Sequence, residues 1–413
     1  MEYAKLTRED DYLRARADEY VWRCARDLGV SRRRFLQLLA ASGTAAALTG
    51  WSSSKAWAGE AAPTPVVKPT PKDLFYDFGS NKEMRWENMF QRGYLVPNEL
   101  FFVRNHTRTP SLDIAKWRLK VEGSGVQRSL DLTYDDVLGL PSVSVIRFVE
   151  CAGNGRSFFA EVQGKKAQGT QWKLGAIGVA EWTGVPLREV LDRAGLKKTA
   201  VDLMPEGLDD LKVRRPMPLA KALEEDTLLV YAMNGQPLPP DHGFPVRVLM
   251  PGWIGIANIK WVGRIEVSEK PLFSSWNTET YVLIGPDYKP NPPSKGPVLS
   301  SQSIKSALEL PWGGEIGSGR KRVRGRSWSP FGKIAKVEYS LDQGASWNSG
   351  KLRDPNIPAA WARWDFDWEA KPGKHNIRVR ATDEKGNVQP DKVPFNEQGY
   401  LYNAMVDHPI VVK

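Results

Sequence analysis

The chain has 413 residues, a formal net charge of +10 at neutral pH, 41% hydrophobic residues and 26% charged residues. This is the composition of an ordinary globular protein, and the length suffices for two or three domains. The positive balance favours an anionic substrate or an acidic partner, whereas no lysine- and arginine-rich block with interleaved aromatic residues occurs, so no nucleic-acid partner is expected.

The N-terminal segment has the features of a twin-arginine export signal. A Ser-Arg-Arg-Arg-Phe-Leu-Gln motif at 31–37 precedes a short apolar stretch, 38–48, and a small-x-small cleavage site at 56–58. The apolar stretch is too short to span a bilayer, and the alternative is a short buried helix. We predict a signal peptide over 1–58, export to the periplasm in a folded, often cofactor-loaded state, and no membrane anchor after cleavage. Cleavage removes Cys24 and lowers the net charge from +10 to +7, because 10 basic and 7 acidic residues leave.

The next part of the chain predicts an α+β domain. A Pro-rich linker is expected over 59–72, and the catalytic domain over 73–290. Strands and helices in it do not alternate regularly, which argues against a doubly wound parallel sheet. The clearest elements are strands at 119–122 and 143–149 and a helix at 187–194 that ends at Gly195.

The C-terminal part predicts a second, all-β domain over 297–413. Five prolines between 285 and 298 mark the boundary, and turn signals follow at 342–344 and 384–387. The expected strands are 321–327, 334–341, 362–368 and 376–381. Short alternating strands at this spacing are typical of an immunoglobulin-like β-sandwich, here without its disulfide.

Four short stretches carry polar residue types between apolar neighbours. They are 102–106 (Phe-Val-Arg-Asn-His), 147–156 around Cys151, 241–247 (Asp-His-Gly-Phe-Pro-Val-Arg) and 259–261 (Ile-Lys-Trp). Together they contain several cations and two of the four histidines: Arg104, His106, Arg156, His242, Arg247 and Lys260. Clustered cations of this kind usually bind a multiply charged anion, with arginine supplying bidentate geometry.

Cys151 is the single cysteine left after signal cleavage. It can be a small buried hydrophobe, pair with another chain, or be held as a thiolate by a metal. A catalytic pair with His106 or His242 is also conceivable. Zinc is poorly supported, since no cysteine pair, histidine pair or His-Glu-x-x-His motif exists. No Cys-x-x-Cys-His motif for c-type haem and no glycine-rich nucleotide motif is present.

From about residue 101 to the C-terminus the chain resembles the sulfite oxidase family of molybdenum enzymes. The matching motifs occur in the same order and at similar spacing: 103–106, 151–154, Trp172 with 175–177, 233–239 continuing into 241–247, and in the sandwich 323–328 and 340–347. The resemblance implies a molybdopterin-binding domain followed by a dimerisation domain, and therefore a homodimer.

The resemblance also implies a cofactor and its ligands. Each chain would hold one molybdenum–molybdopterin, with the Cys151 thiolate on the metal, which suits a soft sulfur ligand. The cofactor-binding residues implied by matching motifs are Phe102, Val103, Arg104, Asn105, His106, Cys151, Asp209, His242, Arg247, Asn258, Ile259 and Lys260. The substrate pocket implied in the same way consists of Arg104, Arg156, Trp172 and Tyr281.

The implied reaction is the oxidation of sulfite, or a related sulfur oxyanion, to sulfate with water as the oxygen source. Electrons would leave singly to an external periplasmic cytochrome c, because no haem-binding segment precedes the molybdenum domain and no haem is expected in this chain. One departure concerns the substrate: Gln398, in the stretch 395–399, stands where animal members carry an arginine. The alternatives are a sulfane dehydrogenase acting on protein-bound sulfur, a cofactor-free adhesion protein built on the sandwich, and a cysteine hydrolase.

Overall fold

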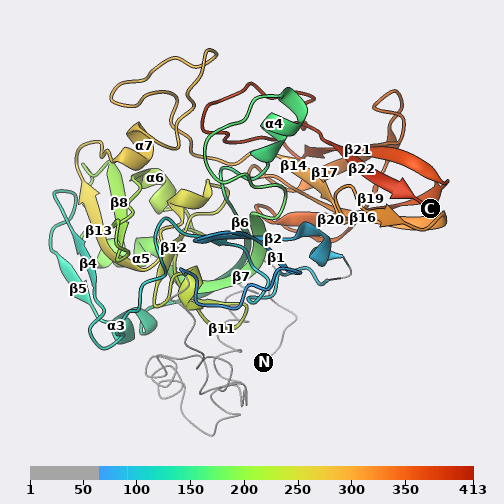
Figure 1. The fold of residues 1–413 in the computed structure, drawn as a ribbon. Helices are drawn as coiled ribbons and strands as arrows, with labels where there is room; N and C mark the ends of the chain where they lie inside the picture. The colour runs from blue at the N-terminus through green and yellow to red at the C-terminus, as the bar shows by residue number, and fades with distance from the viewer. Residues whose placement is uncertain (1–64, 91) are drawn as a thin grey trace, which may run out of the picture.

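The computed structural model describes residues 65–90 and 92–413, which form two domains joined by an extensive interface (Figure 1). The predicted signal peptide, 1–58, lies outside the described residues. No helix within the described ranges is long and apolar enough to cross a membrane.

The described part of the segment expected as a linker packs against the first domain instead. Val66 is 3% exposed, and the backbone N–H groups of Val67 and Lys68 donate to the Asp241 carboxylate at 2.9 and 2.7 Å. The prolines of this segment favour an extended backbone, but extension does not prevent such a segment from docking on a neighbouring surface. The segment expected as an extended linker is therefore docked on the first domain through these contacts.

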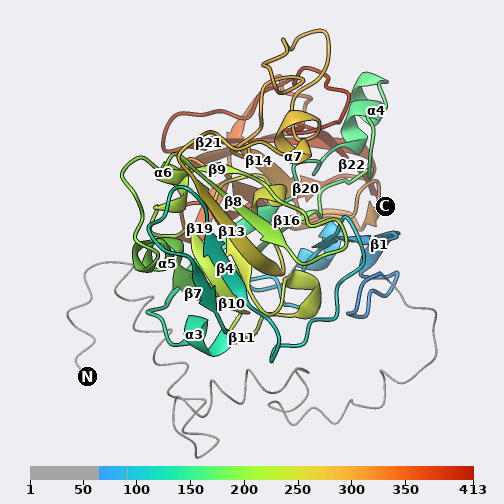
Figure 2. The same ribbon diagram turned by 90° about the vertical axis from the view of Figure 1, so that its left-hand side faces the viewer.

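The first domain contains three sheets and a few short helices, which confirms the α+β class. An N-terminal sheet has the order β1-β2-β3, a central sheet β11-β10-β7-β6 with β12 beside β10, and a third sheet β5-β4-β13-β8-β9. Only β13 and β4 pair in parallel in these three sheets (Figure 2). The strands are β1 Phe75–Phe78, β2 Asn81–Met84, β3 Val103–Arg104, β4 Leu119–Glu122, β5 Leu130–Leu132, β6 Val143–Glu150, β7 Ile177–Pro186, β8 Asp202–Gly207, β9 Met217–Pro218, β10 Leu228–Met233, β11 Gln236–Pro237, β12 Arg247–Leu249 and β13 Val262–Ser268.

The helices of this domain are short, and their ends follow local chemistry. They are α3 Tyr134–Leu138, α4 Ser157–Gln163, α5 Leu187–Arg193, α6 Leu219–Ala222 and α7 Ser275–Thr278, with 3-10 turns η3 Trp86–Met89, η4 Pro240–His242 and η5 Gly255–Ala257. Helix α3 begins with a capping box between Thr133 and Asp136. Helix α5 stops before Gly195, whose φ of 69° permits the left-handed turn, as its sequence predicts.

The central sheet is buried on both faces and holds the domain together. Side chains on a strand alternate between faces, and β10 shows this: Leu229 and Tyr231 pack into the cluster shared with the third sheet. Leu228 and Val230 belong to the other cluster, which reaches across to Trp328 of the second domain. The central sheet therefore packs against the third sheet on one face and against the second domain on the other.

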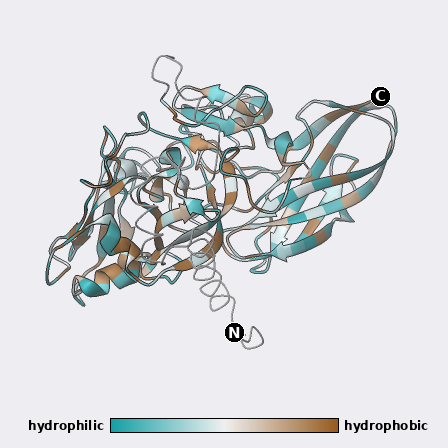
Figure 3. Cartoon of the chain, turned by 90° about the horizontal axis from the view of Figure 1, so that it is seen from below, coloured by the Kyte–Doolittle hydropathy of each residue, from teal (hydrophilic) through white to brown (hydrophobic). Residues whose placement is uncertain are grey.

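The second domain is a two-sheet sandwich, as the alternating pattern predicts. One sheet has the order β14-β16-β20-β19 and the other β15-β22-β21-β17-β18. Along its strands hydrophilic and hydrophobic residues alternate (Figure 3), and β21 follows this pattern with Ile377, Val379 and Ala381 buried. The strands are β14 Lys305–Leu308, β15 Glu315–Ile316, β16 Gly319–Trp328, β17 Ile334–Ser340, β18 Asn348–Ser349, β19 Lys351–Asn356, β20 Trp361–Ala370, β21 Gly373–Asp383 and β22 Asp407–Val412.

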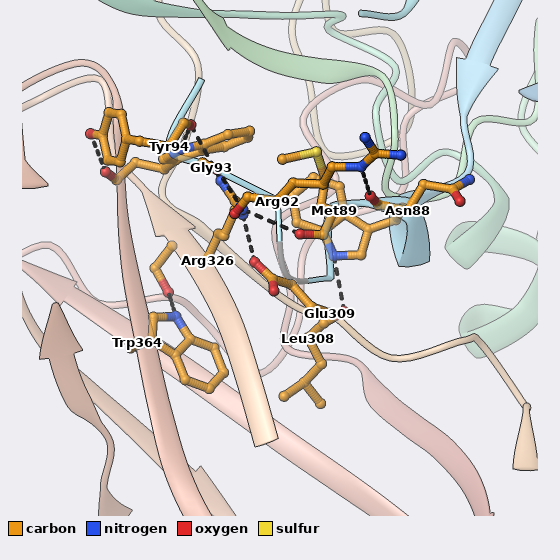
Figure 4. A network of polar contacts seen from close by, with 12 residues as sticks. Asn88, Met89, Arg92, Gly93, Tyr94, Leu308, Glu309, Arg326 and Trp364 are labelled. Atoms are coloured by element: carbon orange, nitrogen blue, oxygen red, sulfur yellow. Dashed lines mark hydrogen bonds and ion pairs between the residues drawn. The ribbon is translucent and has the colours of Figure 1, made fainter. Parts of the chain in front are cut away.

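A buried arginine of the second domain, paired with a glutamate of the same domain, donates hydrogen bonds across to the first domain (Figure 4). Arg326 of β16 is 0% exposed and contacts Glu309 at 2.6 Å. Its guanidinium also donates to backbone carbonyls of the first domain, including those of Gly93 at 3.1 Å and Tyr94 at 3.3 Å. These carbonyls satisfy the remaining donors of a buried cation, which a single carboxylate would leave unpaired. The interface is therefore a fixed junction.

Candidate functional site

A pocket lined by both apolar and polar side chains opens where β3, β6 and the segments before β12 and β13 meet. It encloses about 720 Å³ of space free of protein atoms, counting its open mouth. Its lining residues are Phe101, Phe102, Arg104, Asn105, His106, Val149, Cys151, Asp209, Val213, Asp241, His242, Arg247, Gly255, Ile256, Asn258, Ile259, Lys260, Trp261 and Tyr281. The four polar stretches of the sequence thus converge on one cavity.

Cys151 lies at the floor of this pocket, directly after β6. Its backbone N–H donates to the Ala176 carbonyl at 2.9 Å, and its carbonyl accepts from Asn154 at 2.9 Å, which starts the turn through Gly155. The residue is 6% exposed, and its thiol is free. A strand end followed by a tight turn holds the sulfur at a defined place facing the cavity.

Two cations line the pocket wall, Arg247 buried and Lys260 half-buried. Arg247 donates to the carbonyls of His242 at 3.1 Å and Asn258 at 3.3 Å, and Lys260 donates to the Asp241 carbonyl at 2.8 Å and to Asn105. Burial lowers the pKa of Arg247 to about 9. Burial, with Arg247 adding repulsion, holds the pKa of Lys260 well below its usual value. A bound anion would reverse these shifts, because it favours the charged forms.

Two buried polar atoms in the wall have no hydrogen-bond partner among residues 65–90 and 92–413. They are Nη1 of Arg104 and Nε2 of His242. Leaving such an atom unpaired costs about 1–3 kcal/mol, so a polar ligand that reaches both is favoured. The Arg104 donor, the acceptor nitrogen of neutral His242, the cations and a soft thiolate ligand fit a metal cofactor that carries a phosphate and a polar ring edge.

Tyr281 and His106 also line the pocket and contact each other. The Tyr281 hydroxyl lies 3.2 Å from Nε2 of His106, whose ring packs on Trp276 with 4.2 Å between centroids. Burial, and then repulsion from Arg104 and Lys260, lowers the pKa of His106 to about 2. His106 is therefore neutral at working pH and can orient the Tyr281 hydroxyl without adding charge.

Not every residue implied by the resemblance reaches the lining. Val103 is fully buried in β3, and Trp172 packs against Phe102 with 6.4 Å between ring centroids. Arg156 is 6% exposed, with Nε bound to the Gln398 carbonyl and Nη1 to the Thr170 carbonyl, both at 2.8 Å. These three residues lie behind the lining, and their predicted roles stay predictions.

Other residues of the site have no signal in the sequence. Lys68, from the expected linker, lies beside Asp241, and burial lowers its pKa to about 7. Arg215 is 1% exposed and donates to the carbonyls of Trp276 and Leu299. Tyr400, from the second domain, stacks on Tyr281. All reach the site through long-range packing, which local patterns do not encode.

No three His, Cys, Asp or Glu side chains gather as a metal site in the described part of the chain. A metal held by Cys151 would therefore take its other ligands from a cofactor or from solvent. Molybdopterin, whose dithiolene supplies sulfurs, meets that requirement.

Comparisons with known proteins assign both domains to described families. Residues 106–276 match the family described as the oxidoreductase molybdopterin binding domain, and residues 303–412 match the Mo-co oxidoreductase dimerisation domain. The fold and the site therefore define a molybdopterin-binding oxidoreductase.

Similar proteins of known identity show to which family of molybdopterin-binding oxidoreductases the chain belongs. Human mitochondrial sulfite oxidase is 37% identical over 336 residues, covering 76% of this chain and 61% of that protein. Sulfite oxidase from Gallus gallus is 35% identical, covering 75% and 72%. The crystal structure of the sulfane dehydrogenase SoxCD from Paracoccus pantotrophus superposes with a TM-score of 0.72 at 28% identity, covering 82% and 86%. The chain belongs to the sulfite oxidase family, and it spans about 61% of the length of the mammalian relatives.

Family membership favours the metal interpretation of Cys151 over the adhesion protein and the cysteine hydrolase. The residues that would hold the cofactor are those whose polar atoms face the cavity. Arg247, Lys260 and His242 would meet the charged and polar parts of the pterin, and Cys151 the metal.

Proposed function

We propose that the protein oxidises sulfite to sulfate with water as the oxygen source and passes the two electrons singly to an external cytochrome c. The observation that carries this proposal is the arrangement of Cys151, Tyr281 and the unpaired Nη1 of Arg104 around one cavity lined with cations. Bound molybdopterin would supply a metal able to accept two electrons. The chain itself supplies charge, orientation and exclusion of water.

The cationic wall would attract and orient the substrate. Arg104 offers a buried donor to an oxyanion, and a donor fixed in a low-dielectric site stabilises developing negative charge more than water does. The Tyr281 hydroxyl, which lies 3.2 Å from Nε2 of His106, is a second donor to the substrate and carries no charge. Burial raises the pKa of Tyr281, so the phenol keeps its proton and can donate it in a hydrogen bond.

Sulfane dehydrogenase activity on protein-bound sulfur is the second candidate. It is favoured by the similarity to SoxCD, which covers 82% of this chain, and by Gln398, which removes a cation that free sulfite would use. We propose it as the alternative, since it needs the same cofactor and the same Cys151.

Sulfite-dependent reduction of cytochrome c by the purified protein tests the function. The proposal predicts turnover with free sulfite alone, and loss of at least about 100-fold in kcat/KM in Arg104→Gln, because a buried charged donor is removed. The matched control is Arg108→Gln, an exposed arginine whose side chain is 70% accessible. Turnover that appears only with a sulfur-bearing carrier protein would reject sulfite in favour of the alternative.

We further propose a periplasmic location after twin-arginine export and a homodimer formed through the sandwich domain. The motif at 31–37 supports the first, and the match of 303–412 to a dimerisation domain supports the second. Analytical ultracentrifugation should give a mass twice that of the chain. A mass equal to one chain at micromolar protein concentration would contradict the homodimer.

A further inference from the structure

A segment of the second domain returns to the pocket of the first. Between β21 and β22, the Leu401 backbone N–H donates to the Ala152 carbonyl at 2.8 Å, one residue after Cys151. The Gln398 carbonyl accepts from Nε of Arg156 at 2.8 Å. The sandwich domain therefore contributes directly to the neighbourhood of the predicted metal ligand.

Tyr400 lies in this segment and touches both Tyr281 and Arg156. Its ring stacks on that of Tyr281, with 5.0 Å between centroids and 12° between planes. The Arg156 guanidinium carbon lies 5.3 Å from the centre of the Tyr400 ring, within the range of a cation–π contact. The residue is 7% exposed, so both contacts are formed away from bulk water.

The segment is itself held rigidly. The Asn396 side chain clamps the backbone of Tyr400, accepting from its N–H and donating to its carbonyl, both at 2.9 Å. Tyr281, in contrast, has a left-handed backbone with φ of 55°, a conformation that a bulky residue adopts only when its surroundings impose it. A fixed ring on one side of Tyr281 is such a constraint.

Arg156 depends on the same segment for its orientation. Nε and Nη1 donate to the backbone carbonyls of Gln398 and Thr170, while Nη2 is the nitrogen nearest Gly153, where an added Cβ would lie only 2.5 Å away. The stretch that lacks the family arginine thus supplies a carbonyl and an aromatic face that direct another arginine toward the Cys151 turn.

We propose that Tyr400 is a positioning residue, supplied by the second domain, that fixes the Tyr281 ring and the Arg156 guanidinium and so sets the affinity of the pocket for a sulfur oxyanion. This inference rests on the proposed function for the identity of the anion. Tyr400 acts through its two neighbours and does not line the cavity itself.

The test compares Tyr400→Leu, which removes the ring, with Tyr400→Phe, which keeps it, in the cofactor-loaded protein. We expect the KM for sulfite and the dissociation constant for sulfate, measured by calorimetry, to rise about tenfold in Tyr400→Leu, since an aromatic pair and a cation–π contact are lost. The kcat should change by less than about threefold, because no group that contacts the reacting atoms is removed. Tyr400→Phe should stay within about threefold of wild type in all constants.

The matched control is Phe395→Leu, which removes a ring of the same segment that packs on Phe159 at 5.5 Å. Equal weakening in Phe395→Leu and Tyr400→Leu would overturn the proposal, as would unchanged constants in Tyr400→Leu. If Tyr400→Leu does not fold, Tyr400→Met is judged by the same outcomes. A wild type that binds sulfate but does not oxidise sulfite would reject the proposed function alone, and selective loss of sulfate binding in Tyr400→Leu would then still support the positioning role.

Discussion

At the scale of residues, the main feature of the site is a group of buried or half-buried ionisable side chains that form no salt bridge with a carboxylate of residues 65–90 and 92–413. Burial is the largest cause of the lowered pKa values of Lys68, His106, His242, Arg247 and Lys260. A protein gains no stability from burying such groups alone, since desolvation of a charge costs several kcal/mol. An anionic cofactor that compensates them explains why they lie together.

Glu83, in the sheet behind Trp172, gives a prediction that does not depend on the cofactor. It is 1% exposed, and Oε1 accepts from the N–H groups of Lys173 and Gly175, both at 2.9 Å. Burial raises the pKa of Glu83 to about 7. Because the folded pKa exceeds the unfolded value, the stability contributed by this group is complete below about pH 4.5 and is lost as the pH rises through about 7.

Glu83→Gln removes this dependence. Between about pH 5 and pH 8 the wild type should lose on the order of 1–3 kcal/mol of unfolding free energy that the variant keeps. The reason is that the variant has no buried proton to lose. Urea unfolding at both pH values measures the change. A difference between variant and wild type that is the same at both pH values would show that Glu83 does not titrate as described.

At the scale of elements, side chains of the second domain hydrogen-bond to the last residue of β6. Glu150, 0% exposed and adjacent to Cys151, accepts from Lys305 of β14 at 2.8 Å and from Trp328 of β16 at 3.0 Å. The side chain of Gln302 donates to the Glu150 backbone carbonyl at 2.7 Å. The strand that delivers the thiol is therefore anchored at its last residue by the sandwich.

Lys305→Met should be strongly destabilising, by about 3–5 kcal/mol, because it leaves the Glu150 carboxylate buried without its cation. The double variant Glu150→Gln with Lys305→Met should recover most of this loss, since no charge remains to be paired. Urea unfolding of the wild type, both single variants and the double variant measures the coupling. The matched control is Lys351→Met, an exposed lysine of the same sheet. Additive effects of the two substitutions would contradict a coupled pair.

The elements that local patterns predicted are present, but those patterns left most of the short strands unassigned and could not predict what any element contacts. Residues 143–149 alternate poorly but are rich in β-branched and apolar types, and β6 occupies that stretch with one more residue. The docking of 65–72 and the stacking of Tyr400 on Tyr281 depend on contacts between segments far apart in the chain. The resemblance to the family therefore implied Tyr281 in the site but gave no reason to include Tyr400.

At the scale of the whole molecule, the two domains form one functional unit. The Arg326 network, the Glu150–Lys305 pair and the segment between β21 and β22 all cross the interface. The sequence predicted both domains and the α+β and sandwich classes correctly. It could not predict that the sandwich, beyond a predicted role in dimerisation, packs behind residues that line the pocket, because spacing along a chain carries no information on how domains dock.

The central claim, that Cys151 binds molybdenum, is tested most directly by X-ray absorption at the molybdenum edge on wild type and Cys151→Ser. A thiolate ligand predicts that the metal in the variant has one sulfur neighbour fewer than in the wild type, and that sulfite turnover is lost while the fold persists. The same number of sulfur neighbours in both proteins, or full turnover in Cys151→Ser, would contradict the account.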